Sequence, residues 1–170
     1  MQFNVAQLLG EPVGATRQYA LDEDIAGLDP DLEPTRPLTG SVRFLRTAEG
    51  VLVQGQLTTQ TRVSCARCST GMLVDVAVRL EEEFLSLVDL PTSTAAASDA
   101  FLIDEQNILD LSEAVRQYVF LALPLRPLCR PDCAGLCARC GHDLNDGPCT
   151  CPPEPPDERW AALAQLLTNQ

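Results

Sequence analysis

Eight cysteines carry most of the chemistry that this sequence offers, and six of them fall within one short stretch, Leu128 to Cys151. The other two belong to the tetrapeptide Cys-Ala-Arg-Cys, which occurs at 65–68 and again at 137–140. Thiolates with this spacing converge in a tight turn on one metal ion, most often zinc. We therefore predict one or two structural zinc ions, with these ligands: Cys65, Cys68, Cys129, Cys133, Cys137, Cys140, Cys149 and Cys151.

The spacing favours one division of these ligands and leaves others open. The four cysteines from 137 to 151 lie close enough along the chain to form a self-contained zinc ribbon, which leaves 129 and 133 to join 65 and 68 in a second site. Alternatively, the four cysteines from 129 to 140 form a local site. Cys149 and Cys151 then join Cys65 and Cys68 as ligands of the other site, or His142 replaces them there. A single zinc with the other cysteines unligated is also open.

Other uses of the cysteines are less favoured. The first ten residues have no basic residue or long apolar run, and no apolar stretch reaches the roughly 20 residues that span a bilayer. We therefore expect a cytoplasmic protein without a membrane partner, where thiols stay reduced and disulfides are rare. Redox motifs work at a helix N-terminus, whereas 65–68 precedes a predicted strand and Gly141 directly follows the second motif. Iron–sulfur ligation fits this spacing less well.

The same composition argues against an enzyme. The chain has one histidine and no lysine, so a catalytic triad or a lysine nucleophile has few residues from which to form. His142 stands next to Cys140 and is expected at the surface or beside a ligand rather than as a ligand itself. A closed site of four thiolates leaves no position open for water. We therefore expect no catalytic residues and no small-molecule substrate.

The charge of the chain is acidic overall but unevenly distributed. The formal net charge is −12, which by itself argues against nucleic acid as a partner. Residues 34–79, however, carry six arginines against two acids, and residues 116–142 carry four against one. These two basic blocks contain the two Cys-Ala-Arg-Cys motifs. Their arginines either face a polyanion or are simply solvated.

The elements that must position the cysteines predict an α+β fold. Residues alternate strictly from Val51 to Val63 and also at 42–45 and 72–80, which predicts an antiparallel β-meander ending near Phe84. The first Cys-Ala-Arg-Cys motif would lie at the tip of its second hairpin. Apolar residues at three- and four-residue spacing over 107–123 predict a helix that packs on the sheet, capped by Asp110 with Glu113 and ended by Pro124.

The remaining segments complete the predicted organisation. Residues 1–10 favour a short strand or helix, 16–21 a strand, and 22–37 an acidic, turn-rich, solvated connection. Residues 91–100 predict a loop, and the prolines at 152–156 a stiff spacer before a last helix around Trp160. We expect a β-rich core domain at 1–127, packed by one or two helices, and a zinc-binding, zinc-ribbon-like tail with a C-terminal helix at 128–170.

This order of features resembles one known family. The chain has a strand ending in VSCARC, a strand ending in EEEF, an acidic loop and then the block ILDLSEAVRQYVFLALPLRPLCRPDCAGLCARCG. In this order, these features resemble the YceD-like proteins, also described as large-subunit ribosomal RNA accumulation proteins. The resemblance covers roughly 38–145 and is strongest at Asp110-Leu111, at the helix running into Leu123-Pro124, and from Pro127 to Gly141. It implies a non-enzymatic ribosome-biogenesis factor that supports large-subunit ribosomal RNA accumulation. It supplies neither a mechanism nor catalytic residues.

Three functional hypotheses follow from these observations. In the first, a zinc-stabilised factor binds ribosomal RNA, a pre-ribosomal particle or a basic ribosomal protein, and arginines flanking the cysteines contact phosphate. The candidate RNA-binding residues are Arg62, Arg67, Arg126, Arg130 and Arg139. The second is a zinc-stabilised protein-interaction module without RNA contact. The third, which the motif context disfavours, is a thiol oxidoreductase.

Overall fold

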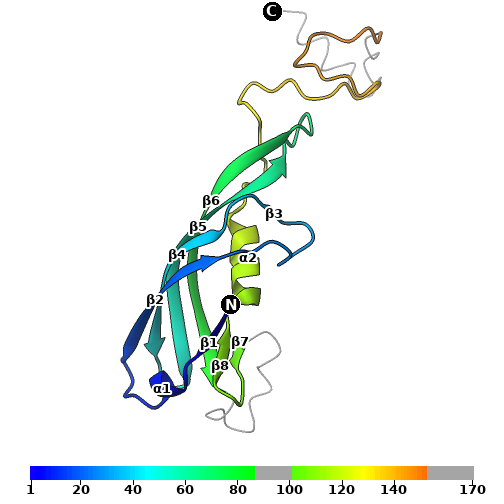
Figure 1. The fold of residues 1–170 in the computed structure, drawn as a ribbon. Coiled ribbons are helices and arrows are strands. Elements are labelled where there is room, and N and C mark those ends of the chain that lie inside the picture. The colour runs from blue at the N-terminus through cyan, green and yellow to red at the C-terminus, as the bar shows by residue number, and fades with distance from the viewer. Residues whose placement is uncertain (87–100, 153–170) are drawn as a thin grey trace, which may run out of the picture.

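A six-stranded sheet, a two-stranded sheet and two helices make up the part of the chain that the computed structural model describes, residues 1–86 and 101–152 (Figure 1). The expected α+β class is confirmed. The predicted loop at 91–100 and the predicted last helix around Trp160 lie outside the described residues. Within these residues, no helix is long and apolar enough to cross a membrane.

The predicted meander forms the centre of the larger sheet. Strands β4 (Leu38–Arg46), β5 (Gly50–Ser64) and β6 (Gly71–Ser86) pair in sequence, each antiparallel to the next. Strict alternation places Val51, Val53 and Leu57 on the inner face, where they are at most 1% exposed. Strand β6 continues past its predicted end to Ser86, because Glu81–Glu83 still pair with Leu52–Gln54 of β5.

Two further strands extend the sheet at its edges, and a short third strand lies off this path. Strand β2 (Thr16–Glu23) pairs antiparallel with β4, which confirms the strand expected at 16–21. Strand β7 (Phe101–Ile103) pairs parallel with the end of β6, so the sheet is mixed rather than purely antiparallel. The two-residue β3 (Glu33–Pro34) pairs with β5 near the tip of the β5–β6 hairpin.

The N-terminal segment contains both elements that its sequence allowed. Strand β1 (Gln2–Asn4) is followed by the one-turn helix α1 (Ala6–Leu9), whose Leu8 is buried. The acidic connection at 22–37 was expected to be solvated, and this expectation is wrong for two of its residues. Ile25 and Leu32 are 2% and 5% exposed, because their apolar side chains complete the core beneath the sheet.

The packing helix is shorter than predicted. Helix α2 runs from Ser112 to Ala122, and the preceding Ile108–Asp110 form strand β8, which pairs antiparallel with β1. The carboxylate of Asp104 accepts the N–H groups of Gln106 and Ile108, and this turn directs the chain into a strand. The N-cap residue is Leu111, not Asp110, although the Asp110 carboxylate accepts the Ser112 N–H at 2.8 Å.

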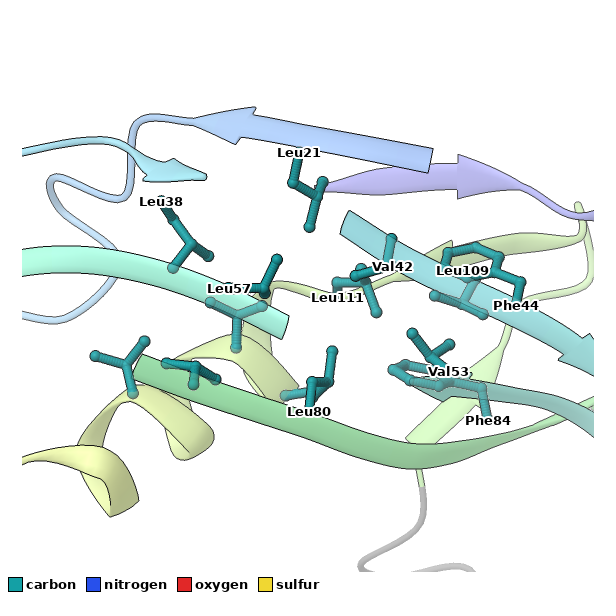
Figure 2. Packing of buried hydrophobic residues seen from close by; sticks show 14 of the residues in the cluster. Leu21, Leu38, Val42, Phe44, Val53, Leu57, Leu80, Phe84, Leu109 and Leu111 are labelled. Atoms are coloured by element: carbon teal, nitrogen blue, oxygen red, sulfur yellow. The ribbon is translucent and has the colours of Figure 1, made fainter. Parts of the chain in front are cut away.

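The core lies between the inner face of the sheet and α2. Ala114, Val115 and Val119 are the buried residues of the helix, which packs mainly on β6. Figure 2 shows how strand and helix-flanking side chains meet in this layer. The largest fully buried side chains include Phe44, Phe84, Leu57, Leu80, Leu109 and Leu111. Pro124 ends the helix, since Leu123 before it is already extended at φ −66° and ψ 142°.

The β5–β6 hairpin is longer than its neighbours and projects beyond them (Figure 1). Its last paired residues are Ser64 and Gly71, whereas the pairing of β4 with β5 stops at Thr58. The chain that leaves α2 runs alongside this hairpin toward its tip. The fold thereby brings the first Cys-Ala-Arg-Cys motif next to the cysteine-rich tail.

Candidate metal centre

A tight turn at the hairpin tip presents two cysteines on the same side. The Cys65 N–H donates to the Thr70 carbonyl and the Ser69 N–H donates to the Cys65 carbonyl, each at 2.9 Å. Ser69 completes the turn with a φ of +60°. The Arg67 N–H also points at the Cys65 sulfur, with a nitrogen–sulfur distance of 3.5 Å. The turn therefore offers both thiols from a backbone that is already fixed by the two long strands.

Backbone hydrogen bonds hold the tail against this turn. The Ala66 N–H donates to the Pro127 carbonyl at 2.8 Å, and the Leu136 N–H donates to the Arg67 carbonyl at 3.2 Å. The Arg67 Nη1 donates to the Cys133 carbonyl at 2.7 Å. Gly135 adopts a φ of +78°, and an added Cβ would lie 3.1 Å from the Arg67 carbonyl oxygen, so a glycine suits this contact.

These contacts gather four thiols from two distant parts of the chain, which we call the hairpin cluster: Cys65, Cys68, Cys129 and Cys133. All four sulfurs lie within 4.8 Å of one another. The sulfurs of Cys65 and Cys133 are 3.8 Å apart, and those of Cys68 and Cys129 are 3.6 Å apart. Three of the four cysteines are buried and pack with Leu128, whereas Cys129 is exposed.

The other four thiols form a separate group, which we call the tail cluster: Cys137, Cys140, Cys149 and Cys151. The Gly141 N–H donates to the Cys137 carbonyl at 2.9 Å, and the φ of Gly141 is +71°, as a tight turn after the motif requires. The Cys137 and Cys149 sulfurs are 3.4 Å apart. None of these four cysteines is buried. His142 belongs to neither cluster and contributes its backbone carbonyl to the Cys137 N–H.

The geometry of both clusters fits one tetrahedral metal ion in each. Four sulfurs at about 2.3 Å from a central ion form a tetrahedron with edges of about 3.8 Å. The sulfur–sulfur distances of 3.4 to 3.8 Å in the two clusters are close to this edge. They are far from the roughly 2.05 Å of a disulfide, and all eight cysteines are free. In an iron–sulfur cubane each cysteine binds a different iron, which spreads the sulfurs wider.

Local hydrogen bonds favour the thiolate form of several of these cysteines. The backbone N–H groups of Cys68 and Arg67 lower the pKa of Cys65 to about 6, and those of Cys140 and Arg139 lower the pKa of Cys137 to about 6. Conversely, the neighbouring Cys140 sulfur raises the pKa of Cys151 to about 12. Four thiolates so close together repel one another, so each cluster favours a cation at its centre.

Asn145 connects the two clusters and was not singled out from the sequence. It lies between the two cysteine pairs of the tail cluster, yet its side-chain N–H donates to the Cys133 sulfur of the hairpin cluster at 3.4 Å. Its side-chain oxygen accepts the Ala134 N–H at 2.8 Å and Arg130 Nη2 at 2.7 Å. The hydrogen bond from the Asn145 side-chain N–H lowers the pKa of Cys133. The run Asp143 to Gly147 signals a turn in the sequence, but no local pattern shows that the turn reaches a distant sulfur.

The five candidate RNA-binding arginines are all exposed, but they differ in what they contact. Arg62 lies 3.8 Å from the Glu33 carboxylate, and Arg130 lies 3.7 Å from that of Asp132. Arg139 donates to the Pro152 carbonyl at 3.0 Å. The other two, Arg67 and Arg126, line one hollow together with Ala66 and Leu128. The structure therefore brings two of the five to a common site.

Comparisons with known proteins identify relatives of the chain. The family model described as "Large ribosomal RNA subunit accumulation protein YceD" matches residues 53–167. An uncharacterised protein of Mycobacterium tuberculosis is 38% identical over 128 residues, which cover 74% of this chain and 60% of the relative. An uncharacterised Mycobacterium leprae protein is 34% identical over 131 residues, covering 77% and 59% respectively.

A plant relative carries a functional name. The maize protein named "Large ribosomal RNA subunit accumulation protein YCED homolog 1, chloroplastic" is 26% identical over 168 residues, covering 81% of this chain and 57% of its own length. The chain thus spans about 60% of the length of each of these three relatives. No solved structure matches it.

The family model covers more than half of the chain and includes all eight cysteines. The resemblance noted from the sequence motifs is thereby confirmed. The name of the matched family refers to ribosomal RNA accumulation and states no catalytic activity. The chain belongs to the YceD family of large ribosomal RNA subunit accumulation proteins.

Proposed function

We propose that this chain is a non-enzymatic ribosome-biogenesis factor that supports accumulation of large-subunit ribosomal RNA. Its tail is clamped to the sheet by cysteine-bound zinc, and the junction of tail and hairpin contacts ribosomal RNA. The family match and the name of the maize relative support this biological process. The observation that carries the molecular role is the hairpin cluster, which joins the two basic blocks of the chain at one place.

Zinc is the metal that best suits the two clusters. It binds four cysteine thiolates tetrahedrally at about 2.3 Å and needs no redox partner. When bound, it would lock the hairpin tip to the tail and supply no reaction of its own, since four thiolates fill its coordination sphere. The boundary proposed between a core domain at 1–127 and a tail at 128–170 stays a prediction. The hairpin cluster takes two cysteines from each side of it.

Exposed arginines beside the hairpin cluster support RNA as the partner. Arg67 lies between its first two cysteines, and Arg126 and Arg130 flank Cys129. Guanidinium groups bind phosphate oxygens by charge-assisted hydrogen bonds. The acidic remainder of the surface, which gives the chain its net charge of −12, would limit nonspecific binding to nucleic acid.

Metal content tests the structural part of this proposal. Elemental analysis of the purified protein should give two zinc ions per chain, and zinc-edge X-ray absorption should show shells of four sulfurs. One zinc per chain, or oxygen or nitrogen in the first shell, contradicts the assignment of two four-thiolate sites. A bound metal with thiols that turn over no disulfide substrate would exclude the oxidoreductase hypothesis.

RNA binding tests the functional part. Affinity for a large-subunit ribosomal RNA fragment should be measurable at low salt and should fall steeply as salt increases, because bound counterions are released. In cells lacking the protein, large-subunit ribosomal RNA should decrease relative to small-subunit RNA, and the wild-type gene should restore it. Absence of binding at low salt, or binding that does not change with salt, contradicts direct RNA contact.

A protein-interaction module is the second candidate, and the ion pairs of the arginines favour it. Arg62 and Arg130 lie against carboxylates of the same chain, which reduces the charge they offer to RNA. The chain's acidic surface would then dock a basic ribosomal protein without RNA. Recovery of a lysine- and arginine-rich ribosomal protein after nuclease treatment supports this candidate, and loss of all partners after nuclease treatment supports RNA.

A further inference from the structure

A small hollow lies where the hairpin tip meets the tail. It has a volume of about 140 Å³ and is lined by Ala66, Arg67, Arg126 and Leu128. This volume exceeds the space that one water needs, yet it is well below the roughly 300–1,000 Å³ of pockets that take small organic ligands. The hollow therefore suits a group of a few heavy atoms.

The described residues that line the hollow carry charge of one sign. Both charged residues among them are arginines, and none of them is a carboxylate. Among the described residues, Arg126 has no hydrogen bond or ion pair, whereas Arg62 and Arg130 lie against acids. Two guanidinium groups at one small hollow repel each other unless an anion lies between them. The chemistry of the lining thus selects an anion.

One of these arginines is already held in place by the fold. The Arg67 Nη1 donates a hydrogen bond to the Cys133 carbonyl, and the Arg67 backbone carbonyl accepts the Leu136 N–H. The first bond orients the side chain and the second fixes its backbone, and the other guanidinium N–H groups are left for a ligand. The opposite wall is fixed as well, because Leu128 packs on the buried hairpin cluster and Pro127 accepts the Ala66 N–H. Fixed donors lose little entropy on binding.

The hairpin cluster holds the two walls of the hollow together. Ala66 and Arg67 lie within the Cys65–Cys68 turn, and Arg126 and Leu128 lie within the three residues before Cys129. A metal ion shared by these cysteines would add four bonds to the hydrogen bonds that already join the two chain segments. Its loss would leave only those hydrogen bonds to hold the two walls together.

We propose that this hollow is an anion site that takes one phosphate group of an RNA backbone and that the metal of the hairpin cluster assembles it. The RNA as the source of the phosphate rests on the proposed function. The anion site itself rests only on the hollow, its two arginines and the cluster. The tail cluster takes no part in it.

Arg126→Gln is the direct test with RNA, since Arg126 has no structural bond to lose among the described residues. Binding of a labelled single-stranded ribosomal RNA fragment, followed by fluorescence anisotropy, should weaken about tenfold. The slope of log affinity against log salt should become shallower by about one, because one phosphate contact is lost. Arg43→Gln is the matched control and should leave the slope nearly unchanged, because Arg43 is exposed on β4 and is not one of the candidate RNA-binding residues. Equal losses for both variants, or none for Arg126→Gln, overturn the site.

Inorganic phosphate tests the hollow independently of RNA. In a nuclear magnetic resonance titration, phosphate should shift the amide signals of Ala66, Arg67 and Leu128 in the wild type but not in Arg126→Gln. Cys65→Ser should abolish these shifts, whereas Cys149→Ser should keep them. Phosphate shifts without RNA binding would retain the anion site and contradict the RNA proposal. RNA binding that Arg126→Gln and Cys65→Ser leave intact would retain the proposed function and overturn the site.

Discussion

The two cysteine clusters have the same ligands but are assembled differently. The hairpin cluster draws its thiols from residues 65–68 and 129–133, and three of its four cysteines are buried. The tail cluster draws all four from residues 137–151, and none of its cysteines is buried. Backbone bonds from Ala66 and Leu136 tie the first to the sheet. The second is held by turns within its own segment.

The hairpin cluster therefore acts as a clamp between distant parts of the chain, and the tail cluster acts as a staple within one short segment. Closing a long loop of chain removes more conformational freedom from the unfolded state than closing a short one. A metal in the hairpin cluster should therefore stabilise the whole junction of sheet, hairpin and tail. A metal in the tail cluster should order only the segment that surrounds it. Variants that remove one cluster at a time measure the two contributions separately.

The largest effect is expected for Cys65→Ser. It removes a ligand from the buried hairpin cluster, and because metal binding is coupled to folding we expect a loss of several kcal/mol in unfolding free energy. Zinc content should fall by one ion per chain, and amides of the tail from 126 to 136 should lose protection from hydrogen exchange. Denaturant unfolding and elemental analysis measure both.

Cys149→Ser is the matched control for that variant. It should also remove one zinc, but the unfolding free energy of the sheet should stay within about 0.5 kcal/mol of the wild type, since this cysteine does not contact the sheet. If Cys65→Ser retains two zinc ions, the hairpin does not donate ligands. If both variants destabilise the sheet equally, the distinction between clamp and staple is wrong.

A smaller effect is expected for Asn145→Ala, which breaks the contact from the Asp143–Gly147 turn to the Cys133 sulfur. The variant removes the N–H donor to the Cys133 sulfur and the acceptor of the Ala134 N–H. We expect a loss of about 1–3 kcal/mol and a 10- to 100-fold weaker affinity of the hairpin cluster for metal. Competition with a chelator, followed by zinc release, measures this affinity.

Asn145→Asp sharpens the comparison. The aspartate keeps an oxygen for the Ala134 N–H but has no N–H for the sulfur. It should therefore weaken the hairpin cluster at least as much as Asn145→Ala, since its second carboxylate oxygen repels the Cys133 thiolate. The affinity of the tail cluster should stay close to that of the wild type. Equal weakening of both clusters would show that Asn145 supports the tail fold in general rather than the Cys133 sulfur.

The smallest effect is expected from pH and concerns the sheet rather than either cluster. Partial burial acts to raise the pKa of Asp110, but hydrogen bonds from Ser112 and Gln2 outweigh it and lower the pKa from 3.8 to about 2. A lowered pKa in the folded state contributes stability that is present above pH 3.8 and lost as the pH falls toward 2. Because the side chain is 45% exposed, solvent screening reduces this contribution to on the order of 0.5 kcal/mol.

Asp110→Asn should therefore be less stable than the wild type at pH 5 and equally stable at pH 2. Denaturant unfolding with excess chelator measures this, because both proteins are then free of metal. A difference that persists unchanged at pH 2 would mean that ionisation of Asp110 is not its cause.

The central strands could be predicted because their pattern is local. Val51, Val53 and Leu57 alternate with polar residues, and only a strand with one buried face places them together. The helix boundary could not be predicted in the same way. Ile108 and Leu109 continue the apolar spacing of α2, but they pair with β1, a segment about one hundred residues earlier. Helical periodicity does not reveal such a distant partner.

The sequence alone determined that eight cysteines with paired spacing are suited to metal, because ligand chemistry and tight turns are properties of a few neighbouring residues. It also favoured the grouping of the thiols that the structure shows, but the competing groupings remained possible. Only the tertiary structure decided between them, since the length of the β5–β6 hairpin sets where Cys65 and Cys68 meet the tail. Asn145 near Cys133 and the hollow between Arg67 and Arg126 depend on the same long-range contact.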